Sequence, residues 1–194
     1  GAGTVGGSVA NTDIGASDNK QSVRAALNDA TITMASTASA SSTSTTATTE
    51  GSETLPDVSV RALNDANVVN LALGGGVAVS TSLVGVSAEG SVSVADVHSA
   101  TLATMNNVNL TAASKSVEVF SKTDGDIVSS ADAFNAVWGS TAEGGLGATV
   151  SVLNSDVDTR TNVNGGSWSV NSAQFEARGI NSIYDVALGL NALD

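Results

Sequence analysis

The feature that most constrains how this chain can fold is an internal repeat. Residues 23–30 (VRAALNDA) return almost letter for letter at 60–66 (VRALNDA), and looser copies follow at 105–112 and 163–170. Each copy has an apolar residue, then Asn, then Asp, Asn or Gly. These apolar residues are Leu27, Leu63, Met105 and Val163, whose numbers increase by 36, then 42, then 58. The increases are near two, two and three times a step of about 20 residues, a length typical of solenoid repeats.

A longer spacing also recurs. Residues 58–60 match 117–119 and then 175–177, and residues 91–94 match 149–152, so that the residue numbers increase by 58 or 59. Residues 7–9 resemble an earlier copy. In so simple a composition a short Val-x-Val string can recur by chance, but the near-identical pair at 23–30 and 60–66 is hard to explain in that way. The repeats favour stacked units that share one continuous core.

Valine alternates with other residues in several runs, at 58–60, 77–79, 92–94, 117–119 and 150–152. Alternation of this kind predicts β-strands with one buried face. Asn-Asp, Asn-Asn and Asn-Gly pairs between the runs suit tight corners, where stacked Asn side chains can form ladders. Only 3% of residues are aromatic against 41% hydrophobic, so the core must be thin, and small inward residues fit a narrow tube.

These observations predict an all-β chain, folded as a parallel β-helix (a β-solenoid) of eight to ten coils of about 20 residues. An antiparallel β-sandwich is the alternative, because it also has short alternating strands. Residues 184–193 could form a short helical cap or a further strand. We expect one solenoid domain over residues 1–194, with a Ser/Thr-rich, low-complexity loop or loosely held hairpin at about 36–56.

The chain carries 7 basic and 19 acidic residues, a net charge of −12. This sign argues against nucleic acid and anionic membranes as partners, because both need Lys and Arg to neutralise phosphate. The longest apolar stretch, 68–86, is interrupted by Asn70, glycines and serines, so no membrane insertion is expected. The absence of cysteine excludes disulfides, thiolate metal sites and cysteine catalysis.

Few residues are candidates for chemistry. The only histidine, His98, shares a strand face with Asp96, and we interpret it as a surface or ladder residue. Residues Asp156, Asp158 and Arg160 also share a face and are the best enzymatic candidate, since polysaccharide-active β-helices need paired carboxylates or a basic residue. A solvated polar face explains them as well. Substrate-gripping aromatics are scarce, with only Trp138, Trp168 and Tyr184 as candidates.

No metal or phosphate motif is complete. Asp124-Gly125-Asp126 has part of a calcium loop, and residues 143–147 (EGGLG) have the glycines of a calcium-binding repeat, but turn residues explain both better. We therefore expect no metal site and no cofactor, with weak Ca²⁺ binding at corners left open. Glycines 74–76 and 144–147 predict close backbone approach or a bulge. The threonines at 43–49 lack the spacing of an ice-binding row.

Residues 57–62 followed by 74–80 (GGGVAVS), and residues 90–94 (GSVSV), resemble the repeats of very large bacterial adhesins of the filamentous-haemagglutinin-like and autotransporter passenger type. The similarity covers most of 57–194 and rests on composition and rhythm. It implies a right-handed parallel β-helix, export, display on the cell surface and no catalysis. It supplies no site residues.

The sequence therefore predicts a non-enzymatic, structural segment of a secreted or cell-surface bacterial adhesin or extracellular fibre. Both ends look like repeat material without a cap, so we expect the solenoid to continue or copies to stack end to end. Two alternatives stay open: a polysaccharide-active enzyme, and an adhesive module in which residues 36–56 bind a host or neighbouring-cell ligand.

Overall fold

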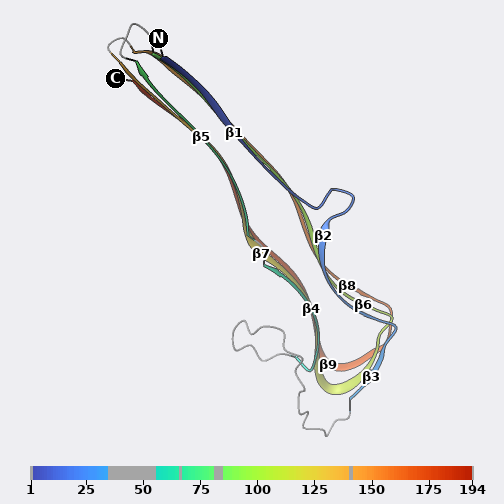
Figure 1. The fold of residues 1–194 in the computed structure, drawn as a ribbon. Helices are drawn as coiled ribbons and strands as arrows, with labels where there is room; N and C mark the ends of the chain where they lie inside the picture. Colours follow the sequence, from blue (N-terminus) through green and yellow to red (C-terminus); the bar gives the residue numbers. More distant parts are fainter. Residues whose placement is uncertain (1, 35–55, 66, 81–84, 140–141, 194) are drawn as a thin grey trace.

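The computed structural model describes residues 2–34, 56–65, 67–80, 85–139 and 142–193 (Figure 1). The predicted loop at about 36–56 falls almost wholly outside these residues. In this described part of the chain, nine strands form two sheets. Sheet A contains β1 (Ala2–Ile14), β2 (Gln21–Asn28), β6 (Gly85–Asn106) and β8 (Ala142–Asn164). Sheet B contains β3 (Thr31–Thr33), β4 (Val58–Asp65), β5 (Val68–Ser80), β7 (Asn109–Gly139) and β9 (Trp168–Leu193).

The chain makes three passes through this pair of sheets. Each pass runs out along sheet A, turns, and returns along sheet B, as Figure 1 shows for the long ribbons of β6 and β7. The first pass is β1–β5, the second is β6 and β7, and the third is β8 and β9. The second pass lies between the other two in both sheets. The all-β prediction is confirmed, and every ladder between the described strands is parallel, so they do not form the antiparallel sandwich.

The strand register corrects the short step that the sequence predicted. Partners in the second and third passes differ in residue number by 56 to 58, as in Val92 with Val150 and Val119 with Phe175. Partners in the first and second passes differ by 59 in β4 and β5, and by 78 to 83 earlier in the pass. The described chain therefore stacks three long passes, and the prediction of eight to ten short coils is wrong.

The longer spacing seen in the sequence is the one that the strands use. Residues 58–60 pair with 117–119, residues 91–94 with 149–152, and residues 7–9 with 90–92. The match at 175–177 is displaced by two positions, because Val119 rather than Val117 pairs with Phe175 after a register shift between Ala112 and Ser116. Residues 184–193 lie in β9, which confirms the strand alternative for that segment.

The near-identical copies at 23–30 and 60–66 do not stack on each other. The first lies largely in β2 of sheet A and the second in β4 of sheet B, so the two face each other across the interior. Ala25 and Leu27 pack against the cluster that contains Val60 and Ala62. The spacing between these two copies is therefore the separation along the chain between facing strands of one pass, and not between successive coils.

Tight turns join the sheets at one end of the molecule. Three of the four repeat copies provide them, with Asp29 (φ 50°), Asn107 (φ 50°) and Gly165 (φ 67°) in the left-handed region that Asn, Asp and Gly tolerate best. The predicted asparagine ladder is present here. Asn106 Nδ2 donates to Asn28 Oδ1 at 2.9 Å, and Asn107 Nδ2 donates to Asp29 Oδ1 at 2.8 Å.

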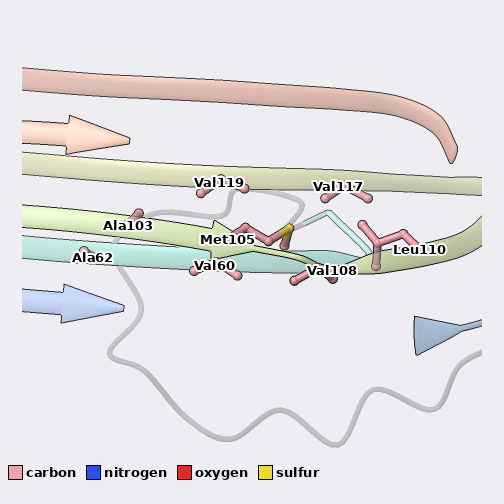
Figure 2. Packing of buried hydrophobic residues seen from close by; sticks show 8 residues of the cluster. All are labelled: Val60, Ala62, Ala103, Met105, Val108, Leu110, Val117 and Val119. Atoms are coloured by element: carbon pink, nitrogen blue, oxygen red, sulfur yellow. The ribbon is translucent and has the colours of Figure 1, made fainter. Parts of the chain in front are cut away.

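The interior near these turns is apolar. Figure 2 shows its eight fully or almost fully buried residues, which come from β4, β6, β7 and the turn after β6: Val60, Ala62, Ala103, Met105, Val108, Leu110, Val117 and Val119. A second, smaller cluster of Val68, Val97 and Ile127 lies farther along the sheets. The part of the molecule that contains the turns is called the arch half. It comprises residues 12–34, 56–65, 67–68, 95–127 and 153–183.

The interior of the other half is polar. This distal half comprises residues 2–11, 69–80, 85–94, 128–139, 142–152 and 184–193. Ser93 Oγ of sheet A lies 2.9 Å from Ser129 Oγ of sheet B, and Ser129 Oγ lies 3.0 Å from Ser151 Oγ in the third pass. Nearer the open end, Ser87 Oγ donates to Asn135 Oδ1 at 3.1 Å. Several buried hydroxyls and amides thus bond one another between the sheets, whereas Ser91 Oγ and Glu89 Oε2 are buried without a hydrogen-bond partner in the described residues.

Small side chains face inward in the distal half because the sheets are close together. A Cβ atom on Gly74 would lie 2.8 Å from the carbonyl oxygen of Gly90 in the opposite sheet, which confirms the predicted close approach of the backbone. A β-bulge lies between the partners of Gly85 and Val86, at residues 142–144, so the predicted irregularity near Gly144 is also present.

The alternating valines are buried only in part of the molecule. Val60, Val117 and Val119 face inward as predicted. Val77, Val79, Val150 and Val152 are exposed on the outer faces, so the alternation does mark one inward face, but these valines are not on it and alternating residues such as Ala78 are. In the narrow distal half most inward positions hold serine, glycine, alanine or asparagine, and most valines point outward, whereas Val137 is fully buried.

We expect Asn107→Ala to destabilise the fold by about 1–2 kcal/mol, because Ala at positive φ is strained and the bond to Asp29 is lost. Asn107→Gly loses the same bond but adopts this φ freely, so it should cost less. Chemical denaturation of both variants measures the difference, and equal losses would show that backbone conformation at Asn107 does not matter.

Candidate functional site

The candidate residues His98, Asp96, Asp156, Asp158 and Arg160 all lie on the outer face of sheet A. They come from β6 and β8, and the register pairs His98 directly with Asp156 and Asp96 with Asn154. Even-numbered residues of both strands point outward here, since their odd-numbered neighbours Val97, Thr101 and Ala103 are buried. The structure therefore brings the two sequence candidates, His98–Asp96 and Asp156–Arg160, into one cluster.

His98 lies between two carboxylates and is itself well covered. Its Nε2 lies 2.8 Å from Asp96 Oδ1, its Nδ1 lies 3.7 Å from Asp156 Oδ2, and its side chain is only 8% exposed. Lys20, from the loop between β1 and β2, lies 2.8 Å from Asp156 Oδ1. Asn154 Nδ2 donates to Asp96 Oδ1 at 3.0 Å. The cluster thus links side chains of all three passes.

The two aspartates of the enzymatic candidate have different partners. Asp156 is paired with Lys20 and His98, and the hydrogen bond from Lys20 is the main cause that lowers the pKa of Asp156. Asp158 accepts a hydrogen bond from Arg160 Nε at 2.8 Å. Ser99, next to His98 in sequence, pairs with Val157 and lies on the alternate face. The arrangement provides ion pairs across strands, and His98 forms no hydrogen bond with a serine or threonine hydroxyl in the described residues.

A shallow depression beside this cluster has a volume of about 560 Å³. Its lining includes Arg24, Leu102, Asp158 and Arg160, and a neighbouring depression also includes Lys20. Sequence reasoning missed Lys20, Arg24 and Asn154 as members of this surface. The longer repeat spacing carried the signal, because it places Asp156 beside His98 and Asn154 beside Asp96.

The remaining sequence candidates lie apart from this cluster. Asp124 is paired with Lys122 at 2.8 Å, and the backbone N–H of Asp126 donates to Asn67 Oδ1 at 2.8 Å. No group of three or more His, Cys, Asp or Glu side chains that could hold a metal ion occurs among the described residues. Trp168 is at a turn, where its Nε1 donates to the carbonyl of Val108, whereas Trp138 and Tyr184 are exposed on sheet B.

Comparisons with protein-family models, with curated proteins and with solved structures find no match for this chain. No helix in the described part of the chain is long and apolar enough to cross a membrane. The resemblance to filamentous adhesins therefore rests on the repeat residues alone.

Two exposed carboxylates predict acid sensitivity. The backbone N–H of Ser116, with Lys115 beside it, lowers the pKa of Asp57 below its ordinary value of 3.8, as Lys20 and His98 do for Asp156. A carboxyl whose pKa is lowered by folding stabilises the fold above its unfolded pKa, and this contribution disappears as the pH falls through the folded value. We expect the melting temperature to fall on acidification below about pH 4.

The Asp57→Asn/Asp156→Asn double variant should show a smaller fall in melting temperature than the unmodified chain over the same pH range. High salt should reduce the difference, because both pairs are exposed and screened. An identical pH profile for the double variant would show that these two ion pairs contribute nothing to acid stability.

Proposed function

We propose that this chain is a structural, non-catalytic segment of a secreted or cell-surface bacterial adhesin or extracellular fibre. In this proposal the three passes are turns of a wide, flattened β-solenoid. The solenoid continues beyond them, or copies of the chain stack end to end. The proposal is supported by the repeat resemblance and, most directly, by the way in which each pass covers the next.

The observation that carries the proposal is the exposure of inward apolar side chains in the third pass. Val119 and Ile127 of the second pass are buried, and their third-pass partners Phe175 and Ile183 are 51% and 54% exposed although they occupy the same inward positions. No described pass lies beyond the third, so its inward side chains have no neighbour on that side. The third pass therefore has an apolar inner edge that a further pass would cover.

The first and third passes are compatible as neighbours. Through their shared partners in the second pass, Phe175 is in the column of Val60 and Ile183 is in the column of Val68. Val163 is likewise in the column of Leu27, through Met105. A copy that stacks in register would place apolar on apolar at each of these positions. Such head-to-tail contact does not close on itself, so it generates a fibre.

Ile183→Lys tests this stacking. An inward charge at the open edge should prevent a further pass from adding, as inward charges do at natural sheet edges. Gln174→Lys adds the same charge to the same strand on an outward, exposed position and is the control. We expect the unmodified chain and the control to form filaments in negative-stain electron microscopy and Ile183→Lys to form none. Filaments that persist in Ile183→Lys would contradict stacking through this edge.

An adhesive role for residues 36–56 is a second proposal, supported by the register. Thr33 pairs with Thr111 and Val58 with Val117, so the residue-number offset between the first two passes falls from 78 to 59 across this connection. The first pass therefore has a much longer connection here than the second. Loops that exceed what a scaffold needs often carry binding functions.

Deleting residues 37–54 leaves a connection about as long as that of the second pass. We expect the deletion variant to unfold at the same temperature as the full chain, since no described strand loses a residue. If residues 36–56 bind a cell-surface ligand, the variant should also lose binding to host-cell monolayers. Equal binding by both chains would exclude an adhesive role for this stretch.

A further inference from the structure

The outer face of sheet B in the distal half is a large exposed apolar surface. We call it the sheet B patch. Its residues come from strands of all three passes and are Val69, Leu71, Leu73, Val77 and Val79 of β5, Phe134 and Trp138 of β7, and Tyr184, Val186, Leu188 and Leu190 of β9. Every one is between 45% and 69% exposed.

The patch is contiguous because the register places its residues side by side. Leu73 and Leu188 flank Asp132, Leu71 and Val186 flank Ser130, and Val69 and Tyr184 flank Val128. Three strands about 4.8 Å apart, each contributing about 12 residues at about 3.3 Å per residue, cover about 570 Å². This area is near the upper end of the largest apolar patch that a typical monomer exposes, about 300–600 Å², and such patches often mark interaction sites.

The charge distribution points to the same surface. All seven Lys and Arg residues lie in the arch half, with none in the ranges that make up the distal half. On the sheet B patch the one charged side chain is Asp132, whose carboxylate accepts a hydrogen bond from Ser130 at 3.1 Å. The interior polar groups of this half are largely bonded to one another, so the exterior is the apolar part.

We propose that the sheet B patch is a lateral interface with the sheet B patch of a second copy of this chain. Two such faces packed together bury about 1,100 Å², which is just above the area of about 1,000 Å² expected of a specific interface. Face-to-face packing of two sheets, about 10 Å apart, is the ordinary way to cover such a surface. This contact uses the outer face and not the strand edges, so it does not depend on end-to-end stacking.

A lipid surface fits the patch less well. Strands β5 and β9 lie at opposite edges of sheet B and pair on one side only. In hydrocarbon their unpaired backbone N–H and C=O groups would each cost several kcal/mol. In a protein–protein contact at the outer face, the same edges stay in water or pair with further passes.

The test uses the Ile183→Lys chain, in which end-to-end stacking is blocked, so that only lateral contact is measured. Val186→Lys/Leu188→Lys adds two charges to the patch at exposed positions. The matched control, Leu63→Lys/Ile180→Lys, adds two charges at exposed apolar positions on the arch half of the same sheet. Sedimentation velocity over a concentration series gives the mass, and circular dichroism confirms that each variant is folded.

We expect the parent chain and the control to form a two-copy species, and the patch variant to associate at least about a hundredfold more weakly, because charged side chains would have to be desolvated. A third variant gives the opposite effect. Asp132→Ala removes the one carboxylate from the patch and should tighten association at least about tenfold.

Three results would overturn the proposal. One is a parent chain that stays monomeric at every concentration, and another is equal association in the patch variant and the control. The third is flotation of the parent chain with phosphatidylcholine vesicles that is lost in Val186→Lys/Leu188→Lys, which would assign the patch to lipid. Filament formation by the unmodified chain tests end-to-end stacking only. The stacking proposal and the lateral-interface proposal can therefore fail independently of each other.

Discussion

Parallel, in-register pairing of strands from successive passes is the constraint on which the rest of the structure depends. Each strand finds its partners far away in the sequence, and the residues of the second pass lie between equivalent residues of the first and third. A column of three residues must therefore be mutually compatible in size and polarity. Two columns show the two solutions. Leu27, Met105 and Val163 pack as apolar residues, and the hydroxyls of Ser93 and Ser151 both bond that of Ser129 in the facing sheet.

This constraint explains why the same Val-x-Val alternation has buried valines in the arch half and exposed valines in the distal half. Where the sheets are far enough apart for Met105 and Leu110, valines face inward and charged residues face outward. Where Gly74 approaches Gly90, most inward residues are Ser, Gly, Ala or Asn, and the larger Glu89 lies against Gly6 and Gly76. The same Val-x-Val alternation then places its valines on the surface, because strand period fixes which residues share a face but not which face is buried.

The sequence was sufficient for the all-β class, the asparagine ladder at the turns and the longer spacing by which strands pair. It misled on the length of one turn of the chain, because the most similar copies, at 23–30 and 60–66, lie opposite each other within a single pass. Two segments with similar sequences have similar surroundings in the structure. Strands that face each other across the interior have similar surroundings just as strands in successive coils do. The cluster around His98 could be found only by combining the longer spacing with strand alternation.

The polar interior also bears on how the fold is specified. Hydroxyl pairs such as Ser93–Ser129 and Thr123–Thr159 need their partners in place, because a register slip of one residue would bury Val92 or Val94 and expose the serines. The serine and threonine columns thus fix register along strands as long as β7, which has 31 residues. This specificity has an energetic cost, because the apolar side chains that would normally form the core remain on the surface of the distal half.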